Sequence, residues 1–87
     1  MKLKVKRVIS DAKLPSYAKK GDAGMDLYAS ESITLKSMER GTVKTGIAVE
    51  IPEGYVGLVW DKSGLSHTHG IKTLGGVVDA GYRGEVK

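Results

Sequence analysis

Two acidic residues stand where a carboxylate could do chemistry. Asp26 lies within the otherwise apolar segment 23–29, and Asp79 follows the β-branched pair Val77–Val78 directly before a glycine-rich turn. A carboxylate on an apolar strand carries a desolvation penalty unless it is hydrogen-bonded, paired with a cation or linked to a metal. Each aspartate is therefore a candidate for general-base or metal chemistry. The alternative for each is an aspartate that caps a turn.

The segment Lys62–Ser66 is a second candidate, because it combines a cation, a hydroxyl and a glycine after a predicted strand. Such a segment can present backbone N–H groups and a positive charge to phosphates. It is not a Walker A loop, since Asp61 stands where that motif has glycine before the lysine. An ordinary polar turn is the alternative.

Two histidines and two large aromatic residues are interpreted without a chemical role. His67 and His69 are expected in a solvent-facing loop, because a protein zinc site needs three or four ligands and no third is evident. Tyr55 and Trp60 are expected in the core or in an interface.

Short strands with glycine and proline turns must position these residues. Alternation of apolar and polar residues predicts strands at residues 2–9, 25–29, 32–36, 42–51, 55–60 and from 82 onward, with short apolar pieces at residues 71–74 and 77–78 between glycines. Turns are predicted at residues 37–41 and 52–54, and Gly57 marks a bulge or a close backbone approach. No segment shows a 3.6-residue apolar period, so the expected fold class is an all-β sandwich or barrel.

Size and composition exclude several classes of protein. The 87 residues allow one domain, the absence of cysteine excludes disulfides and thiolate metal sites, and no apolar run approaches a membrane span. Seven of the fourteen basic residues lie within residues 1–20, and only Tyr17 is available there to stack bases, so stable nucleic-acid binding is not expected. A cytoplasmic location is expected, and a chain this small needs self-association or a further portion to bury enough surface.

Three motifs together resemble the trimeric dUTPase family over essentially the whole chain. Segments 23–29, 62–66 and 76–84 are similar to motifs one, two and three of that family, in the same order, and residues 52–55 lie between them as expected. The resemblance implies a jelly-roll-like all-β fold and a homotrimer with sites between its subunits. It also implies Mg²⁺-dependent hydrolysis of dUTP to dUMP and pyrophosphate, which limits uracil in DNA and supplies dUMP for thymidylate synthesis.

The resemblance assigns roles to the residues around the reacting phosphate. Asp79 resembles the residue that orients and activates the attacking water, and Asp26 resembles the acid that supports Mg²⁺ through waters. Lys62, Ser63 and Gly64 resemble the phosphate contacts of motif two.

Roles for the nucleoside end follow from the same resemblance. The ring of Tyr82 would pack against deoxyribose and leave no room for a 2′-hydroxyl. The backbone of residues 74–78, including Gly76 and Val78, would read uracil, and Thr73 stands where many relatives have an asparagine that contacts the base.

The chain also departs from the family pattern. Lys62 replaces the usual arginine of motif two, and Asp61 beside it is interpreted as a partner for that cation. Motifs four and five would lie beyond Lys87, so residues 1–87 are expected to be one partial domain, inactive alone. Two alternatives remain open at this point: a dCTP deaminase, or bifunctional enzyme, of the same fold, and a non-catalytic trimeric binding module.

Overall fold

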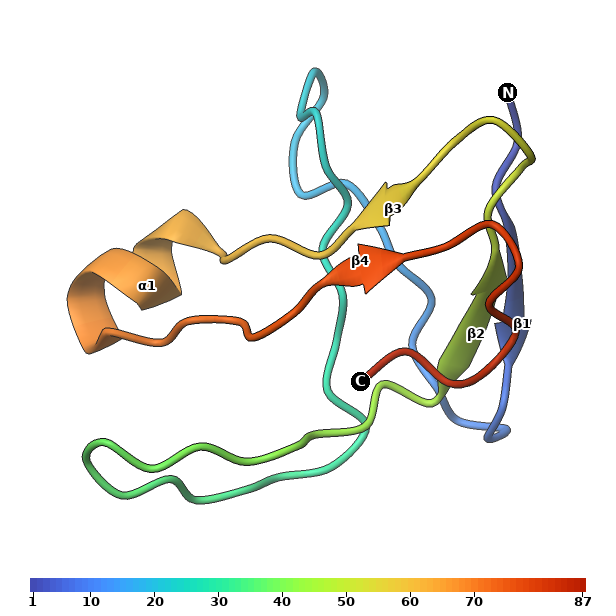
Figure 1. Ribbon diagram of the computed structural model, residues 1–87. Coiled ribbons are helices and arrows are strands. Elements are labelled where there is room, and N and C mark those ends of the chain that lie inside the picture. Colours follow the sequence, from blue (N-terminus) through green and yellow to red (C-terminus); the bar gives the residue numbers. More distant parts are fainter.

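A computed structural model describes residues 1–87 and contains four short strands and one helix. The elements follow the order β1 (Lys4–Arg7), β2 (Ile47–Glu50), β3 (Gly57–Leu58), α1 (Ser63–His69) and β4 (Val77–Val78). Figure 1 shows two strand pairs, from which the segment carrying α1 and a long loop extend toward the same side of the molecule. The structure is consistent with part of the all-β fold that was predicted.

The core is built on the first strand pair. β1 and β2 are antiparallel, with Val5 opposite Val49. The alternation along β2 places Ile47, Val49 and Ile51 on the buried face, and Ile47 is only 1% exposed. The C-terminal segment joins the same sheet through a bridge between Ala48 and Glu85. The whole hydrophobic core consists of five residues, namely Ala12, Ile47, Val49, Ile51 and Val86.

The second strand pair follows a tight turn. The Tyr55 amide donates to the Pro52 carbonyl over 3.1 Å and Gly54 has φ +84°, which confirms the predicted turn at residues 52–54. β3 and β4 then pair antiparallel, with Gly57 opposite Val78. A Cβ on Gly57 would lie 3.0 Å from Ile51 Cδ1, so the predicted close approach at this glycine is confirmed.

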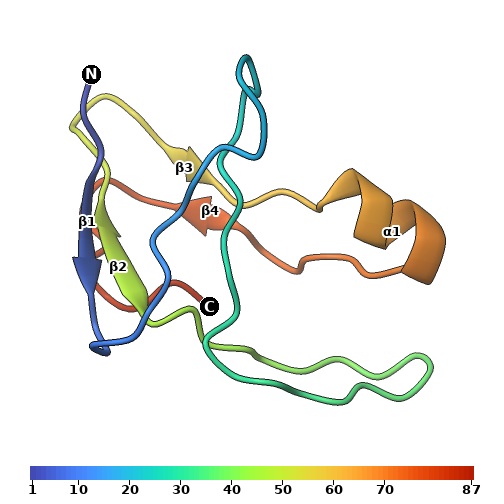
Figure 2. The same ribbon diagram turned by 180° about the vertical axis from the view of Figure 1, so that it is seen from behind.

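Three predicted strands are wrong, because the segment from residue 82 onward forms only the isolated bridge between Ala48 and Glu85, and two earlier segments form no strand either. Segment 25–29 forms only an isolated bridge between Ser16 and Asp26. Segment 32–36 lies in an irregular loop, seen from behind in Figure 2, whose base is closed by the Ser30 amide donating to Lys44 O over 2.8 Å. Alternation failed here because Ile33 and Leu35 are exposed and have no sheet to face. The predicted turn at the loop tip is confirmed by the 3.0 Å bond from the Glu39 amide to Lys36 O.

The expectation that residues 62–70 contain no helix is also wrong. Helix α1 ends at Gly70, which adopts φ +66° and donates its amide to Ser66 O over 2.9 Å. None of the helical residues is buried, so the sequence had no reason to carry an apolar stripe. His67 and His69 therefore lie in the last helical turn and not in a loop. No helix of the structure is long and apolar enough to cross a membrane.

Candidate functional site

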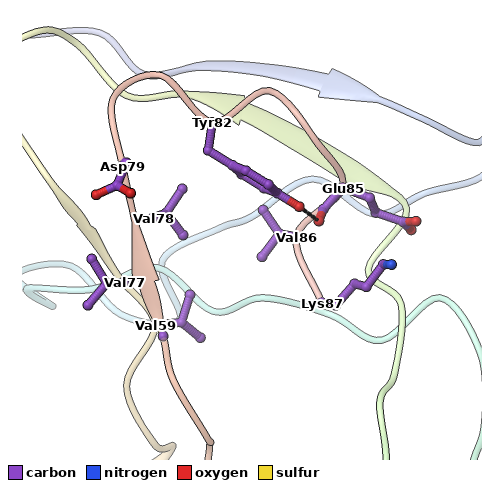
Figure 3. Close-up of a pocket in the computed structure, with 9 residues that line it drawn as sticks. Val59, Val77, Val78, Asp79, Tyr82, Glu85, Val86 and Lys87 are labelled. Atoms are coloured by element: carbon purple, nitrogen blue, oxygen red, sulfur yellow. Dashed lines mark hydrogen bonds between the residues drawn. The ribbon is translucent and has the colours of Figure 1, made fainter.

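A pocket lies between β4 and the C-terminal segment and gathers four of the predicted site residues (Figure 3). Its volume is about 220 Å³. The four are Gly76, Val78, Asp79 and Tyr82, and the remaining lining residues are Val59, Val77, Glu85, Val86 and Lys87. The residues of predicted motif three therefore converge on one concave surface.

Asp79 lies at the edge of this pocket, immediately after β4. Its carbonyl accepts the Tyr82 amide over 3.1 Å, so a turn carries the chain from the acid to the aromatic ring. The desolvation penalty considered for this carboxylate does not arise, because Asp79 is exposed, and its carboxylate enters none of the four ion pairs of the structure. An unpaired, exposed carboxylate is free to accept a proton from a water molecule.

The ring of Tyr82 is held in place by its own turn. Its hydroxyl donates to Glu85 O over 2.8 Å (Figure 3). The ring also lies so close to Gly84 that a Cβ there would be 2.6 Å from Oη. Residue 84 must therefore be glycine for the ring to take this position. The sequence analysis did not identify the Glu85 carbonyl as the anchor of the ring. Gly84, which leaves room for the ring to fold back, was a signal for it.

Asp26 and Lys62 form a second cluster. Lys62 Nζ donates to Asp26 Oδ1 over 2.9 Å, and the Asp26 side chain is 28% exposed. The bridge to Ser16 fixes the backbone of Asp26, whose amide donates to Ser16 O over 2.8 Å. Since the carboxylate is paired with a cation and partly exposed, it carries little of the desolvation penalty that the sequence suggested.

Ser63 and Gly64 open α1 directly after this ion pair. Neither they nor Lys62 line the pocket beside Asp79. A single chain therefore presents two separate groups of predicted site residues, a cation–carboxylate pair leading into α1 and a pocket with a free carboxylate.

The donors for a divalent cation are sparse. No cluster of three or more histidine, aspartate or glutamate side chains is arranged to hold a metal ion. Asp26 Oδ1 accepts the lysine, which leaves Oδ2 for a water molecule. Such an arrangement fits Mg²⁺ bound mainly by phosphate oxygens and waters, because Mg²⁺ keeps much of its hydration shell.

Asp61 does not pair with Lys62, so that interpretation is wrong. Asp61 Oδ1 accepts the backbone amide of Thr73 over 2.6 Å and its hydroxyl over 2.7 Å, and Oδ2 lies 3.3 Å from Lys72 Nζ. The bonds from the Thr73 amide and hydroxyl, followed by Lys72, hold the pKa of Asp61 below its ordinary value. Thr73 lines a second pocket together with Asp61 and Gly75, outside the one beside Asp79.

The sequence matches a known protein family over most of its length. The family model described as dUTPase matches residues 10–87. A deoxyuridine 5′-triphosphate nucleotidohydrolase of Thermobifida fusca is 45% identical over the whole chain, which covers 50% of that relative. The corresponding protein of Clostridium kluyveri is 47% identical, and the match covers the whole of this chain and 62% of the relative. The chain thus spans about half the length of these curated relatives.

Solved structures agree with the sequence comparison. A variant dUTPase from phage phi11 of S. aureus, described with a structural Mg(II) ion, superposes with a TM-score of 0.91 at 38% identity, covering 99% of this chain and 56% of that one. A variant dUTPase of Staphylococcus bacteriophage 80alpha, solved with dUpNHpp, gives a TM-score of 0.90 at 39% identity, covering 98% of this chain and 55% of that one.

Proposed function

This chain belongs to the dUTPase family, and we propose that the whole protein hydrolyses dUTP to dUMP and pyrophosphate. The observation that carries the proposal is the pocket that is lined both by Asp79, with its free carboxylate, and by Tyr82, with its anchored ring. Relatives named deoxyuridine 5′-triphosphate nucleotidohydrolase and a structure with dUpNHpp support the choice of substrate.

In this proposal Asp79 is the general base. The carboxylate takes a proton from a water molecule while the water oxygen bonds to the α-phosphorus, and the bond from the α-phosphorus to the bridging oxygen breaks. The products are dUMP and pyrophosphate, which leaves with the bridging oxygen. The exposure of Asp79 supports this role, because the water must reach it.

Tyr82 is proposed to select the deoxyribose. The bond to Glu85 O and the contact with Gly84 fix the ring, so its outer face is a flat, rigid surface for a sugar. A ribose would place its 2′-hydroxyl against that face without a hydrogen-bond partner. The backbone near Gly76 and Val78 would read uracil at the other end of the same pocket.

The triphosphate is assigned to the second cluster. Lys62, with the hydroxyl of Ser63 and the backbone at Gly64, would contact phosphate oxygens, and Asp26 would support Mg²⁺ through water. The ion supplies charge neutralisation for the phosphates when bound. Side-chain selectivity by Thr73 is limited to accepting a hydrogen bond, because its own hydrogen is directed to Asp61.

A homotrimer with sites between subunits would join the two clusters, which lie apart in a single chain. Exposed large apolar residues support such contacts, among them Leu58, Trp60, Leu74 and Val77. Trp60 and Tyr55 are 79% and 57% exposed, so the prediction that they lie in the core is wrong. Their position in an interface stays a prediction.

The test uses the whole protein with Mg²⁺ and compares wild type, Asp79→Asn and the loop variant Asp22→Asn. Pyrophosphate release from dUTP should fall by about 10²- to 10⁴-fold in Asp79→Asn and stay near wild type in Asp22→Asn. Equal rates in wild type and Asp79→Asn would show that the base is misassigned. Ammonia release from dCTP would indicate a deaminase, and a folded trimer that turns over neither nucleotide would indicate a binding module.

A further inference from the structure

The hairpin between β3 and β4 loses its backbone ladder before it reaches α1. Gly57 pairs with Val78, Leu58 pairs with Val77, and the Val59 amide donates to Gly76 O over 2.8 Å. At this point Gly75 and Gly76 adopt φ +76° and +101°, which turns the returning arm away from its partner.

Beyond the last backbone hydrogen bond, the side chain of Asp61 connects the two arms of the hairpin. Its Oδ1 accepts both the amide and the hydroxyl of Thr73, at 2.6 and 2.7 Å, and Lys72 approaches Oδ2 at 3.3 Å. Two bonds to one residue fix both the position and the orientation of Thr73. The carboxylate is 25% exposed, and ionised acceptors form stronger hydrogen bonds than neutral ones.

The contact between Asp61 and Thr73 joins the two ends of the segment 62–72, which contains α1. Lys62, the next residue along the chain, is held by Asp26 at 2.9 Å, and Thr73 leads directly into residues 74–76. Asp61 therefore lies between the segment proposed to bind phosphates and the backbone proposed to read uracil. A shift of its carboxylate would move both.

We infer that Asp61 is a positioning residue which, acting through Thr73, sets the separation of the two hairpin arms and thereby the placement of the backbone of residues 74–76 against the base. The inference rests on the proposed function, because it assigns that backbone to uracil. Asp61 itself touches neither the reacting phosphorus nor the water, so its loss should act on substrate recognition and leave the chemistry at Asp79 intact.

The test measures the steady-state kinetics of the whole protein with dUTP and dTTP. Asp61→Ala should raise KM for dUTP about tenfold, keep kcat within about threefold, and lower the preference for dUTP over dTTP about tenfold, as expected for a lost charge-assisted contact. Asp61→Asn keeps a carbonyl acceptor for Thr73 and should recover most of the loss. Asp22→Ala removes a comparable carboxylate bond, from the Lys19 amide at 2.9 Å, and should change none of these parameters.

A double variant shows whether Asp61 acts through Thr73. Thr73→Val should reproduce part of the Asp61→Ala effect, and the double variant should be no worse than Asp61→Ala alone. The inference is overturned if Asp61→Ala keeps the wild-type KM and dTTP discrimination, if only kcat falls, or if the two losses add fully. Wild-type protein that fails to hydrolyse dUTP would instead overturn the proposed function, and the inference with it.

Discussion

Two regions of the molecule are held together in different ways. The framework region, which we define as β1, β2 and residues 85–86, contains four paired positions along one strand pair and most of the core. The hairpin region, residues 57–78, has two paired positions and an exposed helix. No residue from Pro52 to Glu85 is buried.

The difference matters because the hairpin region carries much of the proposed site. Its geometry depends on the positive φ of Gly75 and Gly76 and on the side chain of Asp61, whereas packing fixes the framework region. A region held by a few polar contacts and glycine conformations opens at low free energy. Contacts with neighbouring subunits in the proposed trimer would then complete what a single chain leaves open.

The largest expected effect is in the framework region. Ile47→Ala removes the only fully buried large side chain and should lower the free energy of unfolding of the whole protein by about 4 kcal/mol. Ile33→Ala, at a side chain 43% exposed, should lower it by less than about 1 kcal/mol. Urea denaturation measures both. Equal losses would mean that the burial of Ile47 in the core adds nothing to stability beyond the contribution of a half-exposed isoleucine.

A glycine substitution should separate the regions by activity. Gly76→Ala combines φ +101° with a Cβ only 2.5 Å from the Val59 carbonyl oxygen, which is backbone and cannot move aside cheaply. We expect the free energy of unfolding to fall by about 2 kcal/mol. We also expect weaker binding of dUTP, measured by titration with a non-hydrolysable analogue, and the binding free energy should fall by more than the unfolding free energy. The matched control is Gly21→Ala, where φ is +90° but the space is open. Retention of affinity in Gly76→Ala would contradict the assignment of this backbone to the base.

A smaller effect is expected where the framework region binds the C-terminal segment. Thr45 is buried, and its hydroxyl donates to Val86 O over 2.5 Å. Thr45→Val leaves that carbonyl without its side-chain donor and should lower the free energy of unfolding by about 1.5 kcal/mol in thermal or urea unfolding. Thr42→Val, at an exposed position, should stay within about 0.5 kcal/mol of wild type. Similar values for the two variants would show that the hydrogen bond from the Thr45 hydroxyl to Val86 O adds nothing to stability.

The same contrast explains how far the sequence could predict the structure. Alternation located β2 because Ile47, Val49 and Ile51 face a core within the chain. The same pattern failed at Ile33 and Leu35, whose side chains remain 43% and 45% exposed in this chain. Periodicity reports burial, and it therefore predicts elements only where burial occurs.

Helix α1 shows a different limit. An exposed helix carries no apolar stripe, yet Gly70 after His67 and His69 was a C-terminal signal of the kind that ends helices. In the site, motif three contributes both Asp79 and Tyr82 to the lining of one pocket. The contact of Asp61 with Thr73 was not predictable, because it depends on where two glycines end the strand pairing.

The smallest expected effect concerns acid pH, and it tests the Asp61 contact directly. Hydrogen bonds from the Thr73 amide and hydroxyl, with Lys72, lower the pKa of Asp61 in the folded state. A depressed pKa contributes stability above the unfolded-state value of about 3.9, and that contribution disappears as the pH falls through the folded-state pKa. Asp61→Asn should therefore flatten the loss of stability between about pH 5 and pH 3 slightly, compared with wild type.

Carboxyl ¹³C NMR of Asp61 separates the causes. Thr73→Val removes the hydrogen bond from the Thr73 hydroxyl and should raise the pKa of Asp61 toward the ordinary aspartate value. Lys72→Met removes a hydrogen bond and a charge, at a lysine that is 74% exposed and screened by solvent, and should raise that pKa less. A larger rise in the pKa for Lys72→Met than for Thr73→Val would mean that the lysine, and not the hydrogen bonds from Thr73, governs the charge of Asp61. In that case the hairpin would be held by a solvent-screened ion pair, and its arms should separate more readily as the salt concentration increases.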